Sequence, residues 1–123
     1  MKTLTLAACL LAIARLVAAQ SRPSEFYFIP VVAHTEGAAS SFFQSDLSIV
    51  NPQSDSVEVT AYVLLGGTDN TNYLTTGRPF TLAAHASLFL PDVLKAQWGQ
   101  SGLATLVLSA TGGASADRRF VAT

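Results

Sequence analysis

Two neighbouring stretches in the middle of the chain alternate apolar and polar residues with a period of two. They are residues 45–52 (SDLSIVNP) and residues 57–64 (VEVTAYVL), with Asn51 to Asp55 between them. Successive side chains of a β-strand point to opposite faces, so this alternation predicts half-buried antiparallel strands. Because the Asn-Pro pair favours a turn, we predict that the two strands form a hairpin.

The alternation also predicts which side chains of these strands face the core. The expected inward residues are Phe43, Leu47, Ile49, Val57, Val59, Ala61 and Val63. The expected outward residues are Gln44, Asp46, Ser48, Glu58, Thr60 and Tyr62. A slip of one residue in the pairing would expose the whole apolar set, so the register is strongly specified.

The stretch that precedes this hairpin is a continuous apolar run, residues 26–33 (FYFIPVVA). Such a run is typical of a strand covered on both faces, or of one that crosses between sheets. Pro30 donates no backbone hydrogen bond, so it indicates a sheet edge or a switch between sheets. Residues 34–40 are expected to form a loop.

Further short strands are expected after the hairpin. Residues 80–82 begin one strand, which continues through Leu90 after a corner at residues 83–85. The inner face of the next strand is Ala104, Leu106, Leu108 and Ala110. A last strand is expected to begin at Arg119 and to continue to Thr123.

Between these strands the apolar period changes from two to four. Leu90, Leu94 and Trp98 are spaced four apart, and Gly99 suits a helix end. We therefore predict a short helix over residues 92–98, with Leu94 and Trp98 covering the open end of the sandwich.

About seven short strands with turn signals every ~8–12 residues predict an all-β fold. We expect an immunoglobulin-like antiparallel β-sandwich with one short helix. The chain has 123 residues, which suits a single domain. We place that domain at residues 20–123.

The N-terminal residues have the plan of a secretory signal peptide. A positive start is followed by an apolar run from Leu4 to Ala14, and then by small residues at 17–19. We expect cleavage after Ala19, with residues 12–14 as a second candidate site and a secreted or periplasmic product. The run is too short for a membrane span, which needs ~20 residues.

Charge and cysteine content exclude some classes of function. The lone cysteine, Cys9, lies in the signal segment, so no disulfide framework is expected. Removal of Lys2 and Arg15 leaves five basic and eight acidic residues, a net charge of −3. The basic residues are scattered apart from Arg118 and Arg119, so nucleic-acid binding is not expected.

Several short motifs occur in an order that resembles a known family. They are FIPVVAH at 28–34, FFQSDL at 42–47, Asn51-Pro52, LPDVL at 90–94 and WGQSG at 98–102. The chain resembles a β-sandwich module of secreted, often multidomain, bacterial proteins. That module has an IP-x-x-x-H opening, a Trp-Arg-Thr-Asp-Leu strand and an Asn-Pro turn.

The resemblance implies an accessory or adhesive domain and carries no catalytic residues over to this chain. Phe43, Gln44 and Ser45 stand where the family has Trp, Arg and Thr. The family module also extends beyond the strand that Arg119 opens. The resemblance therefore implies that residues 20–123 are part of a longer open reading frame.

Three residues are candidates for ligand binding. Asp46 is expected mid-strand, either binding a ligand or pairing with Arg118 or Arg119 on a neighbouring strand. Tyr62 and Trp98 are aromatic side chains that could stack on a sugar, although Trp98 also suits a core plug and Tyr62 a lone exposed aromatic.

Other constellations fit known chemistry less well. His34 and His85 match no metal-ligand spacing, the Asp69 to Asn72 stretch lacks the spacing of a calcium loop, and there is no Gly-x-Ser-x-Gly elbow. We therefore expect no enzyme activity, no metal and no cofactor.

The sequence thus predicts a secreted, non-catalytic module for attachment, spacing or protein–protein interaction. The first alternative is a carbohydrate-binding module that uses exposed aromatics on a polysaccharide, and the second is a small hydrolase. If residues 120–123 form an edge strand, its open backbone groups are expected to recruit a strand from a partner.

Overall fold

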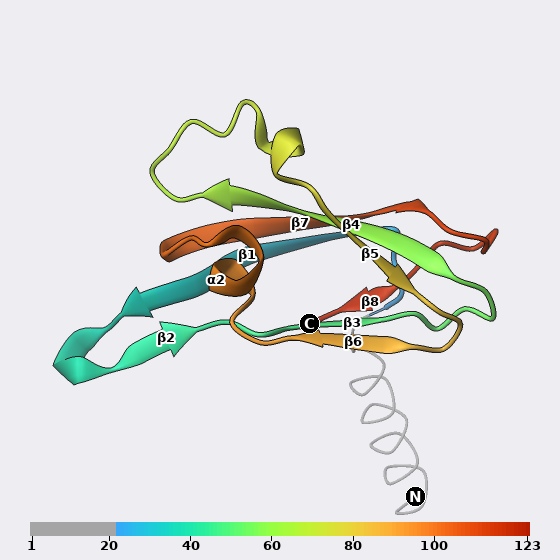
Figure 1. Cartoon of the computed structure of the whole chain (residues 1–123), viewed down its shortest axis with the longest axis horizontal. Coiled ribbons are helices and arrows are strands. Elements are labelled where there is room, and N and C mark those ends of the chain that lie inside the picture. Colours follow the sequence, from blue (N-terminus) through green and yellow to red (C-terminus); the bar gives the residue numbers. More distant parts are fainter. Residues whose placement is uncertain (1–21) are drawn as a thin grey trace, which may run out of the picture.

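The computed structural model describes residues 22–123, which form two antiparallel β-sheets and one short α-helix (Figure 1). The prediction of a β-rich fold built from antiparallel sheets is confirmed. The predicted signal peptide at residues 1–19 lies outside the described residues. No helix in the described part is long and apolar enough to cross a membrane.

Eight strands divide between the sheets, where about seven were expected. In spatial order the five-stranded sheet contains β2 (Phe42–Gln44), β1 (Phe26–Glu36), β7 (Gly102–Gly112), β4 (Val57–Leu65) and β5 (Arg78–Leu82). The three-stranded sheet contains β6 (Ser87–Leu90), β3 (Leu47–Val50) and β8 (Val121–Ala122). The larger sheet is curled like half of a barrel, and the smaller sheet packs against one of its faces (Figure 1).

The core lies between the two sheets, and its residues follow the predicted alternation. Fully buried members from the larger sheet are Val57, Val59, Ala61, Leu106 and Leu108, and members from the smaller sheet and its flanks are Leu47, Ile49 and Phe120. The predicted inward residues of β4 and β7 are therefore confirmed. Thr60, which was expected to face water, is buried on the outer face of the sheet, where its hydroxyl bonds that of Thr111 at 2.9 Å.

The predicted hairpin between the two alternating stretches is wrong. β3 pairs with β6 and β8 in the smaller sheet, whereas β4 pairs with β5 and β7 in the larger one. The chain therefore crosses from one sheet to the other between these strands. An alternating pattern specifies the core-facing side of each strand but not its neighbour, so it fits a crossing as well as a hairpin.

Asn51 explains why the chain crosses at this point. Its side chain is completely buried. Its Nδ2 group donates to the carbonyl oxygens of Asp55, Leu82 and Ala83 at 2.8, 3.2 and 2.9 Å, and its Oδ1 accepts from the backbone N–H of Gln53 at 2.9 Å. Leu82 ends β5 and Ala83 begins the β5–β6 connection, so the Asn51 amide joins the β3–β4 crossing to the β5–β6 crossing.

A third crossing, from β7 to β8, is attached at the same end of the sandwich. Ser115 donates its backbone N–H to the carbonyl oxygen of Ser56 at 3.0 Å, and the Gln53 side chain donates to the carbonyl oxygen of Arg119 at 2.8 Å. Gly113 has φ +105°, and a Cβ there would lie 2.4 Å from the Ser56 carbonyl oxygen. Only glycine fits this approach without strain.

The expectation that residues 26–33 are covered on both faces is also wrong. Phe26 and Phe28 are 54% and 58% exposed, because nothing in the described chain covers the outer face of β1. Between Ile29 and Val32 the strand gains one residue relative to β7, which is a β-bulge. Pro30 lies in this bulge, and from Phe26 to Val32 the side of β1 away from β7 has no paired strand, as expected for an edge.

The predicted loop at 34–40 begins too early, because β1 continues to Glu36. It pairs with β2 in a protruding hairpin that turns through η1 (Ala38–Ser40), a 3-10 turn. Phe43 is 56% exposed rather than buried. Phe43 pairs with Thr35 of β1 and lies on the outer face of the larger sheet, which no element of the described chain covers, and the β1–β2 hairpin extends away from the sandwich (Figure 1).

The helix prediction is confirmed. α2 spans Val93–Trp98, Leu94 is fully buried, and Trp98 packs against the core. Gly99 ends the helix with φ +66°, the left-handed conformation that glycine favours. η2 (Tyr73–Thr76) lies in the predicted loop at 68–76.

The last strand is shorter than expected but firmly attached. β8 pairs Val121 and Ala122 with β3, and Phe120 is completely buried. Phe120 and Ser24 exchange two backbone hydrogen bonds of 2.9 Å, which join the smaller sheet to the start of β1. The two sheets are thus linked along one side.

Replacement of Asn51 by alanine is expected to lower the free energy of unfolding by about 3 kcal/mol. The substitution leaves buried carbonyl oxygens and one N–H without partners, and each unpaired group costs ~1–3 kcal/mol. Urea denaturation measures the change. Asn72→Ala is the matched control, since Asn72 is exposed, and it is expected to cost under ~0.5 kcal/mol. Equal losses in the two variants would contradict the role of Asn51.

Candidate functional site

Asp46 does not lie mid-strand as predicted. It is exposed in the link between β2 and β3, and its Oδ1 accepts a hydrogen bond from the backbone N–H of Asp92 at 2.8 Å. The expected pairing with Arg118 or Arg119 is wrong, because the ion pairs of the described residues do not include Asp46 and the Arg119 guanidinium binds Asp117. Asp46 therefore joins the start of the helix to the chain that leads into β3.

Asp46 belongs to a polar cluster that connects three segments. The Nδ1 atom of His34 lies 2.8 Å from Oδ1 of Asp92. Ser45 bonds Ala33 twice, because its Oγ accepts from the Ala33 N–H and its own N–H donates to the Ala33 carbonyl oxygen, both at 2.9 Å. The Ser45 carbonyl oxygen also accepts from the N–H of Val93 at 2.8 Å.

Three of the short sequence motifs meet at this cluster. The FIPVVAH, FFQSDL and LPDVL segments meet there, and their polar side chains bind backbone groups or one another. Asp92 has φ +47°, a left-handed conformation that its two partners help to hold. The polar members of the motifs thus fasten β1, β3 and α2 at one end of the sandwich.

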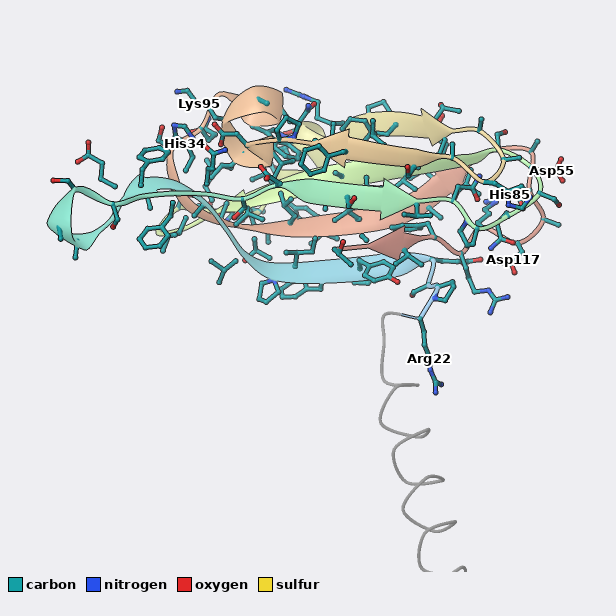
Figure 2. The ribbon with its side chains drawn as sticks, turned by 90° about the horizontal axis from the view of Figure 1, so that it is seen from below. Arg22, His34, Asp55, His85, Lys95 and Asp117 are labelled. Carbon is teal, nitrogen blue, oxygen red and sulfur yellow. The ribbon has the colours of Figure 1, made fainter. Side chains whose placement is uncertain are left out.

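The two histidines lie far apart. Figure 2 labels His34 and His85 at opposite ends of the molecule. Within residues 22–123, no group of three His, Cys, Asp or Glu side chains is arranged to hold a metal ion.

Trp98 and Tyr62 occupy different places in the fold. The Trp98 indole N–H donates to the carbonyl oxygen of Thr76 at 2.8 Å, which ties α2 to η2. Tyr62 was expected to be a lone exposed aromatic. It is instead half-buried, edge-on to Tyr73 with ring centroids 5.9 Å apart. Asp46, Tyr62 and Trp98 are therefore each engaged in separate contacts.

Within residues 22–123, several exposed large apolar side chains lie together on the outer face of the five-stranded sheet. Tyr27, Ile29 and Val32 of β1 pair with inward residues of β7, so the intervening residues point outward. Figure 2 shows side chains projecting from the outer side of β1, away from the sandwich.

The register assigns five exposed residues to this face. Phe26 and Phe28 alternate with the inward residues, and the bulge leaves Val31 exposed beside them. Leu103 pairs with Ala33, and Phe43 pairs with Thr35 two residues further along β1. We define the apolar strip as Phe26, Phe28, Val31, Phe43 and Leu103, which are 54–63% exposed.

The apolar strip continues across the sheet in register. Phe28 pairs with Val107 of β7, which pairs with Tyr62 of β4. Val107 is only 8% exposed although it points outward, because its large neighbours cover it. Among the outward positions of β4, Glu58 alone is charged, and its carboxylate accepts a hydrogen bond from Thr111 at 3.1 Å. The outward positions of β1, β2 and β7 are all uncharged.

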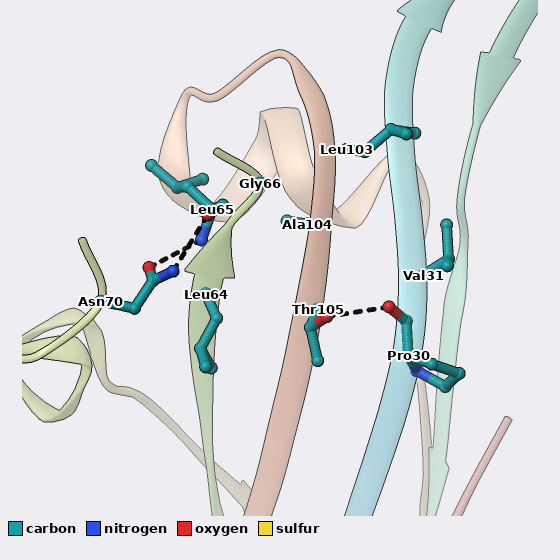
Figure 3. A pocket seen from close by; sticks show the side chains of 9 residues that line it. All are labelled: Pro30, Val31, Leu64, Leu65, Gly66, Asn70, Leu103, Ala104 and Thr105. Carbon is teal, nitrogen blue, oxygen red and sulfur yellow. Dashed lines mark hydrogen bonds between the residues drawn. The ribbon is translucent and has the colours of Figure 1, made fainter. Parts of the chain in front are cut away.

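A shallow depression of about 330 Å³ lies in this face, between the ends of β1, β7 and β4 (Figure 3). Its lining is mainly apolar and includes Val31 and Leu103 of the strip. Thr105 uses its hydroxyl to bond the Pro30 carbonyl oxygen at 2.8 Å. Asn70 binds both backbone groups of Leu65, at 2.9 and 3.0 Å. The polar side chains of the depression thus hold the backbone in place.

Sequence reasoning missed this face because it expected residues 26–33 to form a strand that is covered on both faces or that crosses between sheets. Continuous apolar runs are typical of strands buried between layers. The available signal was Pro30, which marked β1 as an edge strand in an antiparallel fold. In such folds one face of the sheet is commonly uncovered.

The chain matches no family model, no curated protein and no solved structure. The resemblance to a bacterial β-sandwich module therefore stays a prediction.

Arg119 is expected to control the titration of Asp117. Hydrogen bonds from the Arg119 side chain and backbone lower the pKa of Asp117 from 3.8 to about 2. We expect an NMR titration of the Asp117 carboxyl carbon to show a midpoint near that value. Because the pKa is lowered on folding, the pair stabilises the fold above about pH 4, and this contribution is lost as the pH falls through about 2.

Two variants test whether Arg119 or its neighbour Arg118 lowers the pKa of Asp117. Arg119→Gln is expected to return the Asp117 midpoint toward its ordinary value, whereas the neighbouring Arg118→Gln leaves it low. A midpoint that moves equally in both variants would show that general positive charge, rather than the Arg119 contact, sets this pKa.

Proposed function

We propose that the protein is a secreted, non-catalytic β-sandwich module that acts in attachment or protein–protein interaction. The observation that carries this proposal is the apolar strip on the outer face of the five-stranded sheet. The largest contiguous apolar patch on the surface of a protein is often an interaction site. Secretion is proposed from residues 1–19.

The arrangement of the polar side chains supports a binding role over catalysis. His34 and Asp92 bind each other, and Asp46 binds the backbone of Asp92. In the depression, Thr105 and Asn70 bind backbone groups. An enzyme instead needs a nucleophile or base that is free to approach a substrate.

The same reasoning makes a sugar-stacking role for Tyr62 and Trp98 the weaker alternative. Sugar stacking needs an open aromatic face. Tyr62 packs against Tyr73, and Trp98 packs against the core with its N–H bonded to Thr76.

We further propose that the sandwich is of immunoglobulin-like type. The pairs β3–β6 and β4–β7 correspond to the B–E and C–F pairs of an immunoglobulin domain. Strand β8 beside β3 and strand β1 beside β7 take the places of strands A and G. Relative to that fold, the first and last strands have exchanged places.

Site-specific crosslinking tests the proposed function. A photo-crosslinking phenylalanine analogue at position 28, in the full chain within the cells that produce it, is expected to give a covalent adduct. The matched control is position 89, because Phe89 of β6 has a similar exposure, 61% against 58%, and lies on the other sheet. Mass spectrometry identifies the adduct, and N-terminal sequencing of the secreted chain is expected to begin at Gln20.

The absence of an adduct at position 28, or equal adducts at positions 28 and 89, would overturn the interaction role of this face. Retention of the chain on insoluble polysaccharide, abolished by Tyr62→Ala, would instead favour the carbohydrate-binding alternative.

A further inference from the structure

We propose that the apolar strip is the contact surface for a second copy of this chain, so that two five-stranded sheets stack face to face. This inference rests on the proposed function and names the partner of the same face. It is argued from the charge of the face, the area of the strip and its geometry.

The absence of charge on the outer faces of β1, β2 and β7 favours a partner whose face is also uncharged. The charged outward position of β4 is Glu58, and Thr111 already donates a hydrogen bond to its carboxylate. A charged partner would lose hydration at this face without gaining an opposite charge. A second copy presents the same neutral, apolar surface and therefore meets this requirement.

The strip has about the area that a small dimer interface needs. Its members are three phenylalanines, one valine and one leucine, each more than half exposed. Together they expose on the order of 500 Å² of side-chain surface, at the upper end of the range for a monomer. Two copies would bury roughly 1,000 Å² from these residues, which is about the lower limit for a specific interface.

The geometry of the strip suits a two-fold axis. It runs along β1 from Phe26 to the hairpin that carries Phe43, with Phe28 and Val31 between. In a two-fold arrangement the Phe26 end of one copy lies over the Phe43 end of the other, so apolar side chains meet along the whole strip. Stacked sheets lie ~10 Å apart, a spacing that large side chains from both faces fill.

Addition of a partner's strand to the edge of β1 is the less favourable arrangement. Pro30 lacks a backbone donor, and the bulge at Pro30 and Val31 interrupts the ladder. The hairpin with β2 also covers the edge from His34 to Glu36. Contact through the face avoids each of these obstacles.

Sedimentation velocity of the purified full chain tests the inference. We expect a monomer–dimer equilibrium, and Phe28→Ser is expected to raise the dissociation constant at least about tenfold, since central aromatic residues dominate interfaces. Phe89→Ser is the matched control and is expected to leave it unchanged. Thermal unfolding of both variants checks that each is folded, which is expected because both side chains are exposed.

Three results would overturn the second-copy proposal. The first is a monomer at concentrations up to about 1 mM. The second is a dimer whose dissociation constant Phe28→Ser leaves unchanged, which would place the contact on another surface of the chain or in residues 1–21. The third is a monomer that binds neutral phosphatidylcholine vesicles through Phe28, which would assign the strip to a lipid surface.

These results are distinguishable from failure of the proposed function. If the chain is monomeric while position 28 still crosslinks to another molecule, only the second-copy inference fails. If position 28 gives no adduct, the interaction role of the face fails as well.

Discussion

The buried amide of Asn51 is the interaction on which the sandwich depends. Its single side chain binds backbone groups of its own turn and of the β5–β6 connection. In this sandwich the chain passes repeatedly from one sheet to the other, and each connection brings polar backbone groups to the edge of the apolar core. Asn51 satisfies these groups at two crossings at once, and Gln53 and Ser56 attach the third beside them.

The opposite end of the molecule is closed by different means. There the chain uses the polar cluster of His34, Ser45, Asp46 and Asp92, together with α2 and the indole of Trp98. The cluster fixes the point at which β1, β3 and the helix meet. His34 and Asp46, which the sequence offered as candidate metal-binding or ligand-binding residues, therefore hold segments of the chain together.

The uncovered surface that remains is the outer face of the larger sheet. The bulge at Pro30 turns two consecutive residues of β1 away from the core and lengthens the exposed apolar strip. An edge strand with proline and a bulge is poorly suited to strand addition, while its broad outer face is well suited to stacking. Pro30 and Val31 thus disfavour the addition of a strand to the edge of β1 and favour contact through its outer face.

The sequence by itself determined the local features of this protein. The alternation at residues 57–63 and 104–110 gave the correct core-facing sides, because side-chain direction in a strand follows from chain geometry alone. The four-residue spacing of Leu90, Leu94 and Trp98 and the glycine at 99 located the helix for the same reason. Asp46 was identified as unusual, although its partner was not.

Only the tertiary structure decided which strands became neighbours. The alternating pattern is the same for a hairpin and for a crossing between sheets. The sequence therefore predicted that β3 pairs with β4, whereas β3 pairs with β6 and β8, and β4 pairs with β5 and β7. The exposure of Phe26 and Phe28 could not be predicted either, because an apolar run does not indicate whether a second layer of the protein covers it. Strand pairing and layer coverage depend on contacts between residues distant in sequence, and such contacts leave no periodic signal in the chain.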